Sequence, residues 1–312
     1  MFTTNFRNES KSKMMQKILK RIYKLFHPVL GEIWCLHRVL NNKSEFVENS
    51  FLEISLEFLE NKIEHFKAVD FVSIDEVYLR RLSKFRYWWQ NKFINITFDD
   101  GFEDIYTNAF PIFKKHNIPF TIYLSTDFIE KKALIWWLVL EEIILNHDEV
   151  ELSSGVVYSS PDLVSKKKVF QIICDLIYHV NDQPADVFRS MLSRYASCFE
   201  KKIAATLSWE QIREMCDSGL CTIGSHTVTH PILTKQPEEE ARKEIKESKR
   251  ILETQLQRDV IHFSYPHSFW NQEVQDIVLD SGYKTATMGY GGSCRYKKDD
   301  VLKLPRVYMV ES

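Results

Sequence analysis

The sequence lacks the features that mark several classes of protein. Only 9 of its 312 residues are glycine and 9 are proline, which excludes collagen-like and low-complexity chains. Its six cysteines include no Cys-x-x-Cys pair, so neither a zinc ribbon nor a disulfide framework is indicated and we expect reduced thiols. No apolar run approaches the roughly 18 residues of a transmembrane helix.

Neither sign of charge is in excess. Lys and Arg total 41 against 43 for Asp and Glu, so we expect no nucleic acid among the partners. The composition is 44% hydrophobic and 27% charged, which is typical of a globular protein with a sizeable core.

Residues 1–30 are strongly basic, with seven lysines and arginines and one acidic residue, Glu9. Lys17, Lys20, Arg21 and Lys24 alternate with apolar residues at helical spacing, which predicts a basic amphipathic helix. Such a helix can lie on an anionic membrane through residues 14–30, or pack on the protein with its lysines in water. No signal-peptide pattern is apparent, so we expect a cytoplasmic protein, in the first case peripheral on the inner face of the inner membrane.

Strand and helix patterns alternate over 31–312. The first expected strand is short, lies within 31–40 and ends at His37, and the others are 94–98, 119–125, 220–225, 260–266 and 284–290. The expected helices are 51–68, 103–116, 208–218, 237–257 and 271–281, and residues 71–82 are expected to form a short strand followed by a helix, the second in the chain after residue 50. Ser73 or Asp75 is the expected cap of the second helix. This order predicts a parallel α/β sheet or barrel. Residues 127–206 are largely helical in pattern and interrupt it as an insertion.

The stretch "NITFDDGFED" ends an apolar strand in two carboxylates, Asp99 and Asp100, followed by Gly101. Asp-Asp-Gly is a good turn sequence, with glycine in a left-handed position. It also places two carboxylates at the carboxyl end of a strand, where α/β enzymes hold their chemistry.

A second motif, "GSHTVTHP", contains His226 and His230. Two histidines four apart can face one point if the segment turns like a helix, although the same spacing occurs in ordinary helices. Two histidines and one carboxylate form a common catalytic metal site. The remaining carboxylate could then accept the proton of an attacking water.

"ITFDDGF" and "IGSHTVTHP" resemble the first two motifs of the polysaccharide deacetylase family (carbohydrate esterase family 4, the NodB homology domain). The segments "LSWEQIREMCDSGLCTIGSHTVTHPILT", "EIKESKRILETQL" and "IHFSYPHS" follow in the family's order, and the resemblance covers 31–125 and 207–310. It implies a distorted (β/α) barrel and a metal-dependent deacetylase. Asp99 would be the general base, and Asp100, His226 and His230 would hold a divalent ion, expected to be Zn²⁺.

The chain departs from the family's pattern in two places. Its tail, "LPRVYMVES", lacks the late histidine that supplies the acid, but "CLHRV" resembles the early strand of biofilm exopolysaccharide deacetylases. His37 is therefore the candidate acid, the alternative being a buried core histidine. Ser264 stands where the family often has the arginine that orients the base. Arg306 either replaces that arginine or is a structural residue. His267 either lines the pocket or is exposed, and we expect it to be exposed.

The expected function is N-deacetylation of an acetamido sugar in surface glycan, lipopolysaccharide or lipid-linked saccharide biosynthesis, with the insertion as a specificity lid. Within the insertion, Trp136 and Trp137 could stack on a sugar, but we expect them in a core. An O-deacetylase, a deformylase, an inactive glycan-binding barrel and a structural partner of a membrane glycosyltransferase are the alternatives.

Overall fold

The computed structural model describes residues 29–41, 52–82, 92–199, 206–295 and 300–311. The helix predicted within residues 1–30 lies outside these ranges except for its last two positions, which begin the first strand. Among the described residues, no helix has both the length and the apolarity needed to cross a bilayer.

Seven strands close into a barrel, which confirms the predicted fold class. Going round the barrel, they are β1 (Val29–Leu36), β13 (Leu304–Tyr308), β11 (Thr285–Gly291), β10 (His262–Ser264), β9 (Cys221–Ser225), β6 (Phe120–Leu124) and β5 (Phe93–Phe98). β5 then pairs with β1, from Gly31↔Phe93 to Leu36↔Phe98. Every pairing in this ring is parallel. All seven carboxyl ends therefore meet at one mouth of the barrel.

Two short strands extend the ring at its edges. β4 (Asp70–Phe71) pairs with β5 in parallel, and β12 (Cys294–Arg295) pairs with β1 in the antiparallel direction. Strands β2 (Arg38–Leu40) and β3 (Glu53–Ser55) form a separate parallel pair.

The alternation of residues along β5 explains how the barrel is filled. Ile94, Ile96 and Phe98 belong to the main apolar core. The alternate residues Asn95 and Thr97 are fully buried on the other face and donate hydrogen bonds to the backbone oxygens of Val72 and Trp34, respectively. Since both faces of a closed parallel sheet are covered, these polar groups must be paired within the protein.

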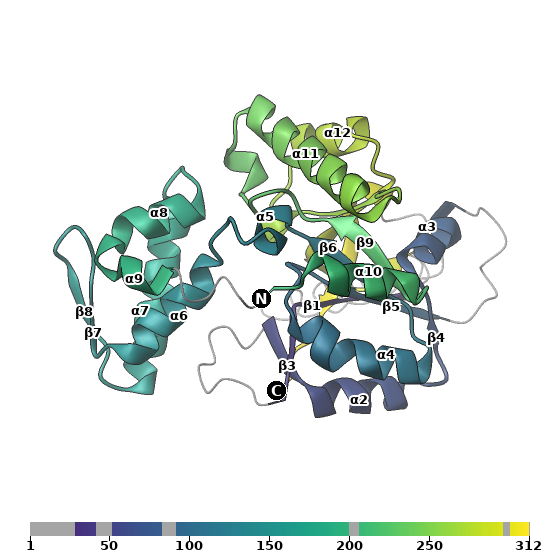
Figure 1. Cartoon of the computed structure of the whole chain (residues 1–312), viewed down its shortest axis with the longest axis horizontal. Helices are drawn as coiled ribbons and strands as arrows, with labels where there is room; N and C mark the ends of the chain where they lie inside the picture. Colours follow the sequence, from purple (N-terminus) through teal and green to yellow (C-terminus); the bar gives the residue numbers. More distant parts are fainter. Residues whose placement is uncertain (1–28, 42–51, 83–91, 200–205, 296–299, 312) are drawn as a thin grey trace, which may run out of the picture.

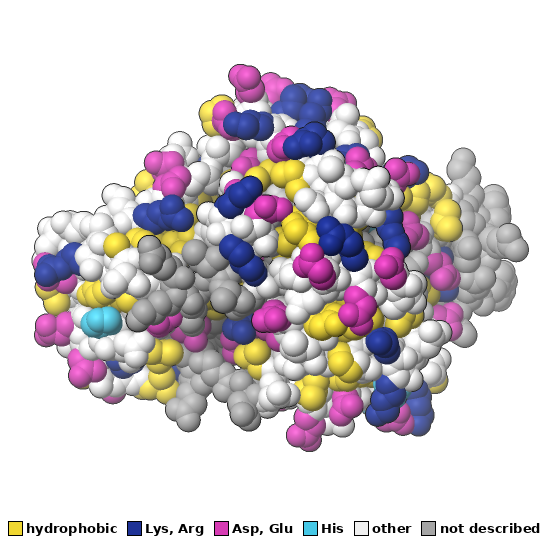
Figure 2. All heavy atoms as spheres, viewed as in Figure 1, with side chains coloured by type: hydrophobic (Ala, Val, Ile, Leu, Met, Phe, Trp, Pro, Cys, Tyr) yellow, Lys and Arg dark blue, Asp and Glu magenta, His cyan; other side chains and the backbone are white. Residues whose placement is uncertain are grey.

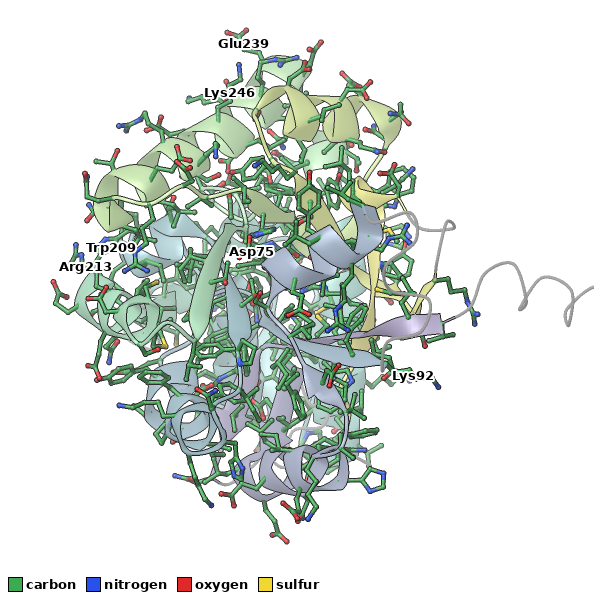
Figure 3. The ribbon with its side chains drawn as sticks, turned by 90° about the vertical axis from the view of Figure 1, so that its right-hand side faces the viewer. Asp75, Lys92, Trp209, Arg213, Glu239 and Lys246 are labelled. Atoms are coloured by element: carbon green, nitrogen blue, oxygen red, sulfur yellow. The ribbon has the colours of Figure 1, made fainter. Side chains whose placement is uncertain are left out.

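Helices surround the ring. They are α2 (Leu56–His65), α3 (Ile74–Leu82), α4 (Phe110–His116), α10 (Trp209–Asp217), α11 (Glu238–Leu256) and α12 (Gln272–Asp280), with α4 preceded by the single π turn η2 (Ile105–Ala109). α11 and α12 lie on one side of the barrel, and α2 and α4 on the opposite side (Figures 1 and 3). The helix predicted over 51–68 begins only at Leu56, because residues 53–55 pair with β2 and the Ser55 hydroxyl caps the helix at the Phe58 amide.

The cap of α3 is Ser73, whose hydroxyl accepts a hydrogen bond from the Glu76 amide. Asp75, the other candidate, lies at the start of the same helix (Figure 3). Its carboxylate instead accepts a hydrogen bond from the buried His262 ring, with Oδ1 3.0 Å from Nε2. This contact joins α3 to β10.

The segment between β6 and α10 forms a helical unit beside the barrel (Figure 1). After the short α5 (Thr126–Ile129) come α6 (Trp136–Asn146), the hairpin β7 (Glu149–Glu151) and β8 (Val157–Ser159), α7 (Leu163–His179), α8 (Pro184–Met191), η3 (Ser193–Tyr195) and α9 (Ala196–Phe199). These elements share an apolar core that includes Val139, Ile173 and Phe188. The strands on either side of this unit are neighbours in the barrel, from Phe120↔Cys221 to Leu124↔Ser225.

Candidate active site

A cavity of about 500 Å³ opens where the barrel strands end, and it collects most of the residues singled out in the sequence. Those that line it are His37, Asp99, Asp100, Trp136, Trp137, His226, His230 and His267. They come from the ends of β1, β5, β9 and β10 and from the helical unit, so the barrel closure brings together segments far apart in the chain.

Three side chains form a set that could hold a metal ion. One ligand atom from each of Asp100, His226 and His230 lies within 4.8 Å of the others. The Asp100 Oδ1 atom is 3.4 Å from Nε2 of His230 and 3.8 Å from Nε2 of His226. Two imidazoles and a carboxylate are the ligands of many catalytic zinc sites.

The bonding around these side chains fits a cation. Asp100 Oδ1 and His230 Nδ1 are buried and have no hydrogen-bond partner in the described structure. His226 Nδ1 is 2.8 Å from the Ser264 backbone oxygen, so this nitrogen carries the proton and the Nε2 lone pair points toward Asp100. A buried carboxylate oxygen left without a partner is costly, and a divalent cation would satisfy it.

The protonation states favour the same conclusion. Burial, and next the neighbouring Asp99 charge, raise the pKa of Asp100 well above its ordinary value. Burial lowers the pKa of His226 and that of His230, so both rings are neutral, which is the state that binds metal. Two adjacent buried carboxylates can both ionise readily only when a positive charge lies between them and the histidines.

The two histidines do not lie on a helical turn. The segment after β9 is a loop in which Thr227 (φ 71°) and His230 (φ 63°) have left-handed backbones. The imidazole rings of His226 and His230 lie with their centroids 4.8 Å apart. Glu244 of α11 holds this loop, because its carboxylate accepts hydrogen bonds from the Val228 and Thr229 amides and from the Thr229 hydroxyl. The loop brings the histidines together, and the sequence analysis missed Glu244.

The Asp-Asp-Gly stretch is both a turn and part of the site. Asp100 has φ 69° and Gly101 has φ 85°. A Cβ atom on Gly101 would lie 2.6 Å from the Leu124 side chain, so only glycine fits there. The turn directs the two carboxylates to different partners.

Asp99 forms a buried two-pronged ion pair with Arg306. Nη1 is 2.7 Å from Oδ1 and Nη2 is 2.6 Å from Oδ2. The guanidinium also donates to the hydroxyls of Ser264 and Thr97 and to the Met288 backbone oxygen. Burial raises the pKa of Asp99, but the Arg306 charge and its hydrogen bonds outweigh burial and keep that pKa below its ordinary value. Asp99 is therefore ionised.

His37 also faces the cavity. It is buried, its ring stacks on Tyr308 with centroids 6.0 Å apart, and its Nδ1 has no hydrogen-bond partner in the described structure. Burial lowers its pKa to about 4. The two residues that follow His37 are anchored to Asp104, whose carboxylate accepts hydrogen bonds from the Arg38 guanidinium and the Val39 amide. This anchoring helps to fix the position of His37. Asp104 and Tyr308 were not recognised in the sequence.

A second set of potential ligands, Cys35, His37 and Asp99, lies close by. It is a poor metal site, because both oxygens of Asp99 are bound to Arg306 and burial raises the pKa of the Cys35 thiol far above its ordinary value. A protonated thiol does not bind metal well.

The helical unit supplies one side of the cavity. Its contributions are Trp136 and Trp137 from α6 and Phe170, Gln171, Cys174 and Tyr178 from α7. Trp136 and Trp137 are buried in the core of the unit, as predicted, and also border the cavity. Phe269, on the barrel side, is 48% exposed.

The prediction that His267 is exposed is wrong. His267 has φ 54° and is partly buried, with its ring 4.4 Å from that of His230 between centroids. The left-handed backbone turns the ring into the cavity, where Tyr178 and the His230 backbone oxygen lie within hydrogen-bonding distance.

The fold and this site define a (β/α)-barrel protein with a histidine and carboxylate centre at the strand ends. The chain belongs to the polysaccharide deacetylase family, whose sequence model matches residues 89–286. No curated protein matches the sequence.

Solved structures show the same fold. The deacetylase PplD of Streptococcus pyogenes, solved in complex with acetate, is 21% identical, with 91% of this chain and 93% of that one covered and a TM-score of 0.62. IcaB from Ammonifex degensii is 19% identical, with 90% and 92% covered and a TM-score of 0.60. The BpsB deacetylase domain from Bordetella bronchiseptica is 15% identical, with 88% and 94% covered and a TM-score of 0.56.

Proposed function

We propose that this protein is a metal-dependent deacetylase that removes the N-acetyl group from an acetamido sugar. The observation that carries the proposal is the division of labour between adjacent carboxylates. Asp100 belongs to a set of unsatisfied metal-type ligands, whereas Asp99 is held apart from it by Arg306. Amide hydrolysis requires a Lewis acid and a separate base within one site.

Asp100, His226 and His230 would hold the ion, which we expect to be Zn²⁺. When bound, such an ion polarises a carbonyl oxygen and lowers the pKa of water to about 7. Asp99 takes the proton of the attacking water. Arg306 orients its carboxylate. Oδ2 accepts from Arg306 and from the Ser264 hydroxyl, whereas Oδ1 accepts from Arg306 and retains a lone pair that can accept this proton.

His37 gives a proton to the departing amine. The His37 side chain lines the cavity, and the stacked Tyr308 ring fixes the plane of the imidazole. Burial keeps the resting ring neutral, with a pKa of about 4. Negative charge that develops on the reacting carbonyl oxygen raises this pKa, so the ring would take up a proton from solvent during the reaction and release it to nitrogen, while Asp99 would return the proton of the water to solvent.

The substrate we propose is a single or terminal acetamido sugar on a lipid-linked saccharide or a lipopolysaccharide intermediate. The helical unit borders one side of the cavity with aromatic and apolar side chains, and Phe269 offers a partly exposed ring. Aromatic rings accommodate both the apolar faces of sugars and hydrocarbon. The basic amphipathic pattern that the sequence shows ahead of β1 would hold the enzyme on the cytoplasmic face of the inner membrane.

The test compares cells that make the wild-type protein with cells that make Asp99→Asn. We expect membrane glycolipids to lose one acetyl group per reactive sugar and gain a free amine only with the wild type, as measured by mass spectrometry. Asn at this position preserves the size of the side chain but leaves the Arg306 charge without its carboxylate, so the amount of folded protein and the loading of its metal site serve as controls.

Four outcomes would contradict parts of the proposal. Release of acetate only from long soluble polymers would rule out the glycolipid substrate. A free hydroxyl in place of the amine would assign an O-deacetylase, and loss of formate would assign a deformylase. Equal turnover by Asp99→Asn would rule out Asp99 as the base.

A further inference from the structure

A chain of hydrogen bonds links the helical unit to the metal-type site. The Tyr178 hydroxyl, on α7, lies 3.2 Å from Nδ1 of His267, in the loop after β10. On the other side of this ring, Nε2 lies 3.3 Å from the backbone oxygen of His230, in the loop after β9. The chain therefore joins three segments that are widely separated in sequence.

Only one arrangement of protons satisfies both contacts. A carbonyl oxygen can only accept, so His267 Nε2 must carry the proton and donate it to the His230 oxygen. With Nε2 as the donor on one side of the ring, Nδ1 accepts the hydrogen bond that the Tyr178 hydroxyl donates on the other side. Each of the three groups thus has a complementary partner.

This bonding shows why His267 is not itself a ligand. Its ring lies against that of His230, with centroids 4.4 Å apart, but both ring nitrogens are already engaged. Its backbone is left-handed (φ 54°), a conformation that costs energy for a residue other than glycine and is kept where the surrounding contacts require it.

A second contact fastens the same parts together. The Lys235 ammonium, five positions after His230, donates to the backbone oxygens of Tyr178 (2.6 Å) and Val180 (2.8 Å). These carbonyls lie at the carboxyl end of α7, where a positive charge is favourable. The end of α7 is thus attached to the segment that follows β9 at two points, through the His267 ring to His230 and through the ammonium group of Lys235.

We propose that Tyr178 and His267 are positioning residues that hold His230 in place for the metal, so that the affinity of the metal site depends on the helical unit. This proposal rests on the metal site assigned under the proposed function. Neither residue is assigned a bond to the ion. They act through the backbone of His230, whose side chain supplies a ligand.

The decisive variant is Tyr178→Phe, which removes the hydroxyl and keeps the ring. The matched control is Tyr195→Phe in the same helical unit, where the lost hydroxyl accepts a hydrogen bond from the Glu151 amide on the β7 hairpin. Affinity for Zn²⁺ is measured on the full chain by competition with a chromophoric chelator, and Co²⁺ absorption reports the geometry at the ligands. We expect Tyr178→Phe to weaken Zn²⁺ binding about 10-fold and alter the Co²⁺ spectrum, and Tyr195→Phe to do neither.

A second variant tests the middle of the chain. His267→Asn places a residue that tolerates the left-handed backbone but is too short to reach the His230 oxygen. This variant should lower the affinity for Zn²⁺ at least as much as Tyr178→Phe does. If the hydrogen bonds act as one unit, the double variant should bind Zn²⁺ no more weakly than His267→Asn alone. Excess Zn²⁺ should return most of the activity of Tyr178→Phe, which a general loss of folding would not permit.

Wild-type affinity in Tyr178→Phe, with an unchanged Co²⁺ spectrum, would overturn the proposal. An equal loss of Zn²⁺ affinity in Tyr178→Phe and Tyr195→Phe would also overturn it, since that result would indicate general disruption of the helical unit. A wild-type protein that binds metal but forms no amine would defeat only the proposed reaction. A wild-type protein that binds no divalent ion would overturn both.

Discussion

Arg306 and Asp99 are separated by 207 residues and meet in a fully enclosed ion pair, with both carboxylate oxygens within 2.7 Å of the guanidinium nitrogens. Arg306 is 1% exposed. Replacing one partner of such a pair lowers the free energy of unfolding by more than the pair itself contributes to stability, because the other charge remains buried and uncompensated.

Arg306→Met should therefore destabilise the fold by about 3–5 kcal/mol. Arg306→Lys should cost less, since it keeps a charge but cannot bind both oxygens of Asp99. Urea denaturation measures both. Arg250, in an exposed pair with Glu247, is the control, and Arg250→Met should leave the unfolding midpoint unchanged. A fully stable Arg306→Met protein would show that the ion pair is dispensable.

Removal of the metal should abolish activity without unfolding the barrel. Dialysis against a chelator is expected to stop amine formation, and added Zn²⁺ should restore it in the wild type. In Asp100→Ala the restoration should fail, because one of three ligands is lost and only the histidines remain. Circular dichroism before and after chelation checks the fold. Undiminished activity after complete loss of metal would refute a metal-dependent reaction.

His37→Gln should slow turnover by about 10²–10⁴-fold, the usual contribution of a general acid or base. Zn²⁺ affinity should be unaffected, since His37 is outside the proposed ligand set. His65→Gln, an exposed substitution of the same kind on α2, serves as the control. If His37→Gln lowered the affinity for Zn²⁺ and left turnover at saturating Zn²⁺ unchanged, His37 would be a structural residue and not the acid.

Asp104→Ala should lower the free energy of unfolding by about 1–3 kcal/mol, because it leaves the buried Val39 amide without an acceptor. It should also reduce turnover, since the residues after His37 lose their anchor. Asp104→Asn, which keeps an acceptor, should be milder. The exposed Asp217→Ala is the comparison, and similar losses in both variants would argue against an anchoring role.

The contact between Asp75 and His262 should give the stability a pH dependence. The hydrogen bond from His262 lowers the pKa of Asp75 in the folded state below its unfolded value. The unfolded chain is therefore protonated first as pH falls, and the contribution, at most about 1 kcal/mol for this half-exposed carboxylate, is complete above about pH 4 and lost below it. Asp75→Asn should be less stable than wild type at pH 7, and the difference should shrink as the pH falls below about 4; a constant difference would contradict this.

Local patterns were sufficient for most of the barrel. The apolar alternation in β5, the Gly101 turn and the amphipathic helices α10, α11 and α12 depend on nearby residues, and their predicted positions agree with the structure within a few residues. The segment 51–68 was less predictable, because residues 53–55 pair with β2 and not with their own neighbours. Surface charge follows composition, since Figure 2 shows basic and acidic side chains interspersed among the described residues of one face.

The sequence by itself determined the family, the barrel and the candidate ligands Asp100, His226 and His230, because these residues lie in short motifs next to strands. Only the tertiary structure decided which partner each group has. Closure of β13 against β1 brings Arg306 to Asp99, and a left-handed loop, not a helical turn, brings His230 to His226. The contact of Tyr178 with His267 spans 89 positions. Such pairings depend on how strands and loops meet in space, and no local spacing of residues encodes them.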